Sequence, residues 1–135
     1  MGQIYIIHTV HNDGLVKIGK SDNFDERFKA YQRTFLLAHL FEIEATSNEL
    51  LLIEKSLHKN LAGIRTPWGG YEYYLMFVEE AFVYVDLFLK DNNVVYKHET
   101  GLQRSKRLLG EHIKVCIEAS INDPTPNPYF ELLLD

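Results

Sequence analysis

The 135-residue sequence contains a single cysteine, Cys116, and no long uninterrupted apolar run. One thiol cannot form an internal disulfide, which excludes disulfide-stabilised scaffolds and agrees with a reducing compartment. Charged residues interrupt each apolar stretch before it reaches the ~18–20 residues that a membrane-spanning helix needs, and no charged-then-apolar leader begins the chain. We therefore expect a cytoplasmic, intracellular protein that makes no membrane contact.

The chain also lacks an excess of basic residues: it contains 14 Lys and Arg and 19 Asp and Glu, which give a formal net charge of -5. Nonspecific nucleic-acid binding depends on many contacts from Lys and Arg to phosphates. This balance excludes a coat protein that binds through overall charge, so a nucleic-acid role would require a local basic surface. Apolar residues make up 46% of the chain, which is enough for a folded core.

The hydrophobic pattern changes between strand and helix periods along the chain. We expect strands at residues 3–10, 15–20 and 38–45. Asp22 would cap a helix of about three turns, in which Phe24, Phe28, Tyr31 and Phe35 recur at helical spacing. A capping pattern of Thr46 and Glu49 opens a helix that runs to about Leu61, and a further helix is expected from Phe77 to about Leu89. Residues 63–74 read as a loop that ends in a short strand. Beyond Asp91 we expect an Asn92–Asn93 turn, a short VVY run, a helix at about 102–119 and a Pro-rich linker at 122–128.

The first two strands carry Tyr5 and Lys17, two polar side chains that a simple hairpin does not require. A two-residue turn at Asp13–Gly14 would place them on opposite faces of the sheet, whereas an odd-length loop with positive φ at Gly14 places them on one face. We predict the odd loop. A lysine beside a phenol favours the phenolate, so we expect a lowered pKa that makes Tyr5 a base. The alternative is an ordinary strand tyrosine beside a lysine that reaches water.

Two charged residues fall on apolar helix faces. Glu54 lies four residues after Leu50 and three before Leu57, on the same stripe. Because an unpaired buried carboxylate is costly, Glu54 is either salt-bridged at the boundary or directed at a metal ion. Arg27 lies among aromatic residues of the first helix, so either its stem covers apolar surface or its guanidinium points at a phosphate.

These residues, in this order, resemble the motifs of the GIY-YIG nuclease superfamily over residues 2 to about 90. The matching segments are QIYII with Tyr5, VKIGKS with Lys17, DERFKAY with Arg27 and IEKSLH with Glu54. Lys17 replaces the superfamily's usual tyrosine, which is similar to a branch frequent in phages and large DNA viruses. In that branch the signature continues as Glu-x-x-x-His and Glu-aromatic-aromatic, here Glu54 with His58 and the EYY of 72–74.

The resemblance implies an α+β domain at 1–90, with a three-stranded antiparallel sheet flanked by helices, and a partly helical extension at 91–135. It also implies a metal-dependent endonuclease that hydrolyses phosphodiester bonds in DNA, with RNA as an open alternative, using Mg²⁺ or Mn²⁺. Tyr5 beside Lys17 would activate or orient water, Arg27 would stabilise the phosphate and Glu54 would hold the ion. The chain departs from the superfamily in having no clear equivalent of its late asparagine.

Four further side chains are candidates for substrate binding: His58, Lys20, Tyr31 and Trp68. His58 lies one helical turn after Glu54, and Lys20 would contribute to a local basic surface. Trp68 would stack on a base or ribose, as aromatic platforms do on single strands. A histidine at the core boundary, a solvated lysine and a core tryptophan are the structural alternatives.

Two other classes of function fit the sequence. One is a catalytically inactive nucleic-acid-binding or protein-interaction module that kept the fold. The other is a subunit that docks through residues 77–135 on a second copy of the chain or on a partner protein. An intact set of Tyr5, Lys17, Arg27 and Glu54 favours the enzyme.

Overall fold

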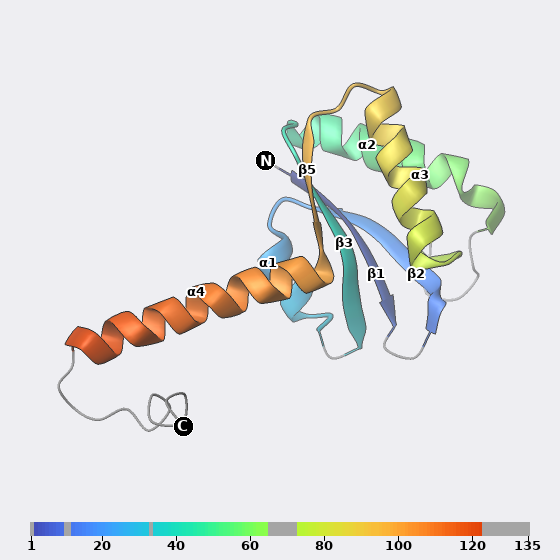
Figure 1. Cartoon of the computed structure of the whole chain (residues 1–135). Coiled ribbons are helices and arrows are strands. Elements are labelled where there is room, and N and C mark those ends of the chain that lie inside the picture. Colours follow the sequence, from blue (N-terminus) through green and yellow to red (C-terminus); the bar gives the residue numbers. More distant parts are fainter. Residues whose placement is uncertain (1, 10–11, 33, 65–72, 123–135) are drawn as a thin grey trace. The chain divides into compact units, whose positions relative to one another are not determined.

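The fold is organised around a five-stranded antiparallel sheet with the order β4-β2-β1-β3-β5 (Figure 1). The computed structural model describes residues 2–9, 12–32, 34–64 and 73–122. It divides into two units, residues 1–101 and 102–135. The strands are β1 (Gly2–Thr9), β2 (Asn12–Ser21), β3 (Phe35–Ile43), β4 (Tyr73–Leu75) and β5 (Tyr96–Thr100). The helices of the first unit are α1 (Phe24–Lys29), α2 (Ser47–Asn60), the short η1 (Ala62–Ile64) and α3 (Val78–Asp91).

The α+β class is confirmed, but the expectation of three strands is wrong. The additional strands are the two edges, β4 and β5. β4 has only three residues, and β5 has the polar sequence YKHET, in which only alternate side chains face the core. β4 is the short strand expected at the end of residues 63–74, whereas β5 is too polar to produce a clear strand pattern. The first unit includes β5, so the sheet continues past residue 90.

The helix after β2 is much shorter than expected. α1 spans six residues rather than three turns, and its N-cap is Asn23 rather than Asp22, with Asn23 Oδ1 accepting a hydrogen bond from the Glu26 N–H at 3.3 Å. Gln3 in β1 accepts a second bond, from the Phe24 N–H at 3.2 Å. The aromatic spacing that suggested three turns continues through a turn that leads into β3.

The other two helices of this unit follow the prediction closely. Thr46 caps α2 by accepting a hydrogen bond from the Glu49 N–H at 3.2 Å. α3 begins at Val78, with Glu80 accepting from the Phe77 N–H at 3.3 Å. It ends before Asn93, whose φ of 55° makes the expected turn.

Alternation along β1 divides the core into two layers. Ile4 and Ile6 are fully buried on the face that α2 and α3 cover, together with Leu50 and Leu57 of α2. Tyr5 and Ile7 are buried on the opposite face, where they pack with Phe24 of α1. The sheet therefore separates a large aliphatic core from a smaller aromatic one.

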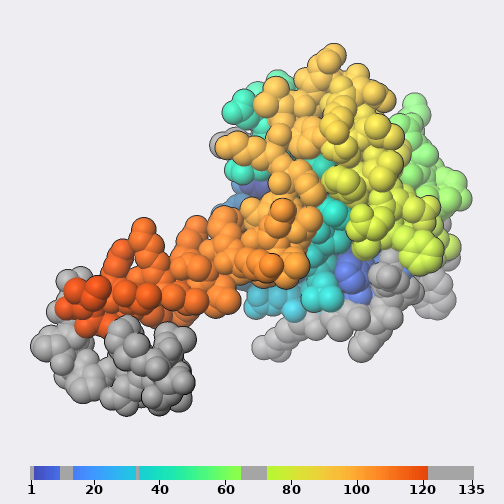
Figure 2. All heavy atoms as spheres, viewed as in Figure 1, coloured from blue at the N-terminus to red at the C-terminus, as the bar shows by residue number. Residues whose placement is uncertain are grey.

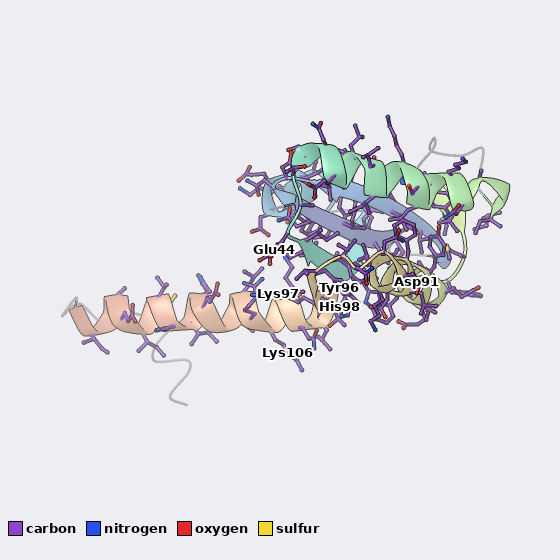
Figure 3. All side chains as sticks on the ribbon, turned by 90° about the horizontal axis from the view of Figure 1, so that it is seen from above. Glu44, Asp91, Tyr96, Lys97, His98 and Lys106 are labelled. Atoms are coloured by element: carbon purple, nitrogen blue, oxygen red, sulfur yellow. The ribbon has the colours of Figure 1, made fainter. Side chains whose placement is uncertain are left out.

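Two histidines join β3, β5 and α3 on the first of these faces. His39 Nδ1 and His98 Nε2 lie 2.9 Å apart, and both rings contact Phe82 of α3, with centroids 4.5 and 4.7 Å away. Glu79 lies 3.5 Å from His39 Nε2. Figure 2 shows α3 and the segment leading into β5 side by side on this side of the molecule, and Figure 3 marks Tyr96 and His98 along β5.

Burial lowers the pKa of both histidines below the ordinary 6.5, and it outweighs the opposing attraction of Glu79 on His39. The charge of His39 lowers the pKa of His98 further, against the weaker attraction of Asp86, Glu79 and Glu99. The unfolded chain thus binds more protons than the folded chain once the pH falls below about 6.5. Acidification should therefore weaken the attachment of β5.

We expect the free energy of unfolding to fall as the pH drops from about 6.5 toward the lowered folded-state pKa values. Replacing both residues, His39→Gln with His98→Gln, should flatten this dependence, measured by urea unfolding at a series of pH values. His112→Gln, at an exposed position on α4, is the control and should leave the slope unchanged. An equal slope in the double variant and the wild type would contradict this assignment.

The second unit contains one long helix, α4 (Gly101–Asn122). Its exposed apolar residues are Leu102, Leu108, Leu109, Ile113, Val115, Ile117 and Ile121. The helix agrees with the one expected at about 102–119. Docking of residues 77–135 on a second copy of the chain or on a partner protein stays a prediction. In the part of the chain that the structure describes, no helix combines the length and apolar character needed to cross a membrane.

Candidate functional site

The β1–β2 register places Tyr5 and Lys17 on the same face of the sheet. Tyr5 pairs with Gly19 and Ile7 pairs with Lys17, so the sum of paired residue numbers is 24. This confirms the predicted face, but the predicted turn position is wrong. Thr9 pairs with Asn12, so Asp13–Gly14 belong to β2 and an irregularity next to His8 and Thr9 shifts the register. The residues of the tip itself lie outside those described.

Gly19 leaves room for the Tyr5 ring. A Cβ atom added to Gly19 would lie 2.5 Å from both Cζ and Oη of Tyr5. Tyr5 is only 1% exposed and packs on Phe24 with ring centroids 5.3 Å apart, so it has little room to move. The glycine of the VKIGKS segment thus has a packing role that the sequence prediction did not assign.

Arg27 is bound to the buried phenol. Its Nε–H donates a hydrogen bond to Tyr5 Oη at 3.2 Å, while the residue itself is exposed. The bond uses one of the five guanidinium N–H groups and fixes the direction of the others. α1 supplies the arginine and β1 supplies its anchor.

Lys17 points to a different tyrosine. Its Nζ donates a hydrogen bond to Tyr31 Oη at 3.0 Å and lies over the Tyr31 ring, 4.6 Å from the centroid. On the other side, the Tyr73 ring of β4 is 5.5 Å away, because Tyr73 is the cross-strand partner of Lys17. Lys17 is 7% exposed, so this lysine is largely enclosed by aromatic rings. Tyr73 was not among the candidate site residues, and its register opposite Lys17 was the missing signal.

The pKa values of the two tyrosines move in opposite directions. Burial raises the pKa of Tyr5 above 10.0, and this effect exceeds the lowering by Lys17 and Arg27, so the expected lowered pKa of Tyr5 is wrong. The hydrogen bond from Lys17 lowers the pKa of Tyr31 below 10.0, against a smaller effect of burial. The lysine therefore favours the phenolate of Tyr31, the more exposed phenol.

Glu54 and His58 belong to the helix that covers the other face of the sheet. Both lie on α2, one turn apart, and both are half-buried. His58 Nε2 lies 2.8 Å from the carbonyl oxygen of Ile18, the residue between Lys17 and Gly19 in β2. In the described part of the chain, β4 pairs with residues 15–17 of β2, and α2 packs on β2.

The remaining candidates are less closely connected to the group formed by Tyr5, Lys17, Arg27 and Tyr31. Lys20 pairs with Ile4, on the α2 face, opposite to Lys17. Trp68 and the glutamate at position 72 lie outside the described residues. Among the residues that are described, no three His, Cys, Asp or Glu side chains come together as a metal site. A magnesium ion held by Glu54 alone would not form such a group, because magnesium keeps several waters.

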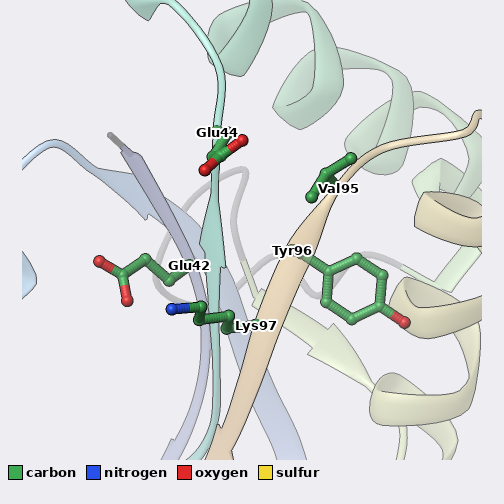
Figure 4. Close-up of a pocket in the computed structure, with 5 residues that line it drawn as sticks. All are labelled: Glu42, Glu44, Val95, Tyr96 and Lys97. Carbon is green, nitrogen blue, oxygen red and sulfur yellow. The ribbon is translucent and has the colours of Figure 1, made fainter.

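A small cavity of about 110 Å³ lies elsewhere, at the outer end of β3 and β5 (Figure 4). It is lined by Glu42, Glu44, Val95, Tyr96 and Lys97. Lys97 points toward Glu42, its cross-strand partner, and Tyr96 points to the other side of the strand. Two carboxylates beside one amine do not favour a phosphate, so this cavity is not the candidate site.

The fold and the site together define a small α+β domain with two cations fixed by phenols on one face of its sheet. A family model, the T5orf172 domain, matches residues 2–88, and the chain belongs to this family. The domain is found in phage and nuclease-related proteins. Neither the curated proteins nor the solved structures contain a match to the chain.

The close approach of Tyr5 and Gly19 leads to a stability prediction. Gly19→Ala should lower the free energy of unfolding by about 1–3 kcal/mol, since the added methyl overlaps an enclosed ring. Gly63→Ala is the control, because a Cβ there meets no atom within 4 Å. Urea unfolding measures both variants. Equal stability of the two would mean that the Tyr5 ring does not occupy this position.

Proposed function

We propose that the domain is a metal-dependent endonuclease of the GIY-YIG type that hydrolyses phosphodiester bonds in DNA. The observation that carries the proposal is the pair of bonds from Arg27 to Tyr5 and from Lys17 to Tyr31, at 3.2 and 3.0 Å, on one face of the sheet. The family assignment supports it, since the T5orf172 domain is found in nuclease-related proteins. In a chain of net charge -5, these two fixed cations form a local site for an anion.

Arg27 is the group that would contact the phosphate. Tyr5 holds the Nε–H, and the guanidinium carries four further N–H groups, two of which can form parallel bonds to phosphate oxygens. Such fixed donors stabilise the charge that develops during hydrolysis. Tyr5 thus orients the arginine from inside the core.

Glu54 is the residue that would hold a divalent ion. Its half-buried carboxylate lies on the α2 stripe that includes Leu50 and Leu57, one turn before His58. A single carboxylate fits Mg²⁺ or Mn²⁺, which take their other ligands from water and substrate phosphate, and does not fit zinc. When bound, such an ion neutralises charge on the phosphate oxygens.

The direct test is incubation of the purified chain with supercoiled plasmid in Mg²⁺, Mn²⁺ or a chelator. We expect nicking with either metal and none with chelator. Duplex, branched and single-stranded DNA and RNA should be compared in parallel. Absence of cleavage on every substrate would overturn the enzyme assignment, and retained DNA binding without cleavage would indicate an inactive binding module.

Glu54→Gln should reduce cleavage by about 100-fold or more, because the neutral amide is a poor ligand for the ion. Glu42→Gln removes an exposed carboxylate on β3 and should leave the rate unchanged. Plasmid nicking measures both rates, and circular dichroism checks that both variants are folded. Full activity of Glu54→Gln would show that the metal is held elsewhere.

Arg27→Lys should reduce cleavage by about 100-fold, because an ammonium group cannot bind both Tyr5 and two phosphate oxygens in a planar arrangement. Lys29→Gln is the matched control on the same helix, since Lys29 is exposed and bonds Glu26 instead. The single-turnover nicking rate is the appropriate measurement. Equal losses in both variants would indicate a general charge effect rather than an oriented guanidinium.

A further inference from the structure

The Tyr5 hydroxyl is poorly placed to receive a proton from water. Its side chain is 1% exposed, its ring lies against Gly19, and its hydroxyl accepts a hydrogen bond from Arg27. A general base must lie within hydrogen-bond reach of the proton that it removes, directly or through one water. Tyr5 meets this condition only if the aromatic core opens.

Tyr31 has the features that Tyr5 lacks. It is partly exposed, it follows α1 by two residues, and its hydroxyl accepts a hydrogen bond from Lys17 at 3.0 Å. An ammonium donor at this distance favours the phenolate. Tyr31 therefore lies in the same cluster as Arg27, beside a cation and accessible to solvent.

The position of Lys17 is set by Tyr73. The two residues are opposite each other in β2 and β4, and the Lys17 amine lies 5.5 Å from the Tyr73 ring. Phe35 packs against both tyrosines, with its ring centroid 5.6 Å from that of Tyr31 and 6.2 Å from that of Tyr73. The aromatic rings thus hold the amine beside the Tyr31 hydroxyl.

We infer that Tyr31, rather than Tyr5, accepts the proton of the attacking water, and that Tyr73 is a positioning residue that keeps Lys17 beside the Tyr31 hydroxyl. The inference rests on the proposed function. The water oxygen bonds to phosphorus while one of its protons passes to the Tyr31 phenolate. The bond from phosphorus to the leaving oxygen breaks, and this oxygen takes a proton from solvent. Tyr31 then returns its proton to solvent, so the cycle closes without any redox partner.

The electrostatics agree with this division of roles. Lys17 lowers the pKa of Tyr31, whereas burial raises the pKa of Tyr5. The same guanidinium that anchors on Tyr5 also lowers the pKa of Tyr31, so the two phenols share one cation but differ in solvation. Of the two phenols, Tyr31 is therefore the more readily deprotonated.

Titration of the phenols tests the inference without any requirement for cleavage. In NMR spectra of protein labelled at the tyrosine ζ-carbon, the Tyr31 signal, identified by its loss in Tyr31→Phe, should titrate below 10.0 and before that of Tyr5. Lys17→Met should move the Tyr31 titration back upward. Tyr73→Leu should move it in the same direction, and Tyr73→Phe, which keeps the ring, should not. Titration of Tyr31 at or above 10.0, or after Tyr5, would overturn the inference.

The rate profile gives the second measurement. If plasmid is cleaved, Tyr31→Phe should lower the rate by about 10²–10⁴-fold and abolish its rise with pH. Tyr5→Phe should lower the rate but keep that rise, because Tyr31 is intact. Loss of the rise in Tyr5→Phe alone would overturn the inference. Absence of cleavage with a low Tyr31 titration would refute the proposed function and leave the assignment of the acidic phenol standing.

Discussion

The pairing of Tyr5 with Gly19 is the constraint on which the site depends. This register puts Tyr5 and Lys17 on one face of the sheet and leaves space for a tyrosine ring over a glycine. A shift of one residue would turn every β2 side chain to the other face. Lys17 would then enter the aliphatic core beneath α2, and a side chain would replace the hydrogen of Gly19 opposite the Tyr5 ring. The local electrostatics of the site therefore follow from a backbone alignment.

Much of the fold could be predicted from the sequence, because strand alternation and helix capping are determined by residues that are close together in the chain. The parity of β1 and β2 predicted the shared face of Tyr5 and Lys17, and Thr46 with Glu49 predicted where α2 begins. Of the two edge strands, β4 was expected as the short strand at the end of residues 63–74, whereas β5 was missed because it is polar and is determined by its neighbour β3 rather than by its own residues. The length of α1 was overestimated because the aromatic residues at helical spacing belong to three elements, namely α1, the turn after it and β3, which together form one cluster.

The site was less predictable because its properties depend on how groups are distributed in three dimensions. The sequence shows a lysine near a tyrosine but not which tyrosine it contacts, and the chain places Tyr31 rather than Tyr5 at 3.0 Å. Nor does it show that Tyr5 is enclosed, which reverses the direction of its pKa shift. Solvation competes with charge here, and solvation is decided by tertiary packing. Glu54 and His58 were placed correctly on one side of a helix, while the contact of His58 with the Ile18 carbonyl of β2 required the fold.

The shortness of α1 has a consequence for the dynamics of the site. A helix of six residues is too short to be stable alone, so it persists through Phe24 and the bonds to Gln3 and Asn23 at its first turn. Segments of this kind open at a smaller free energy than the strands beneath them. Arg27 thus belongs to a small cooperative unit that can unfold while the sheet stays intact, and its release would uncover the Tyr5 hydroxyl. Assembly and disassembly of the anion site would then be a local folding equilibrium of this short segment.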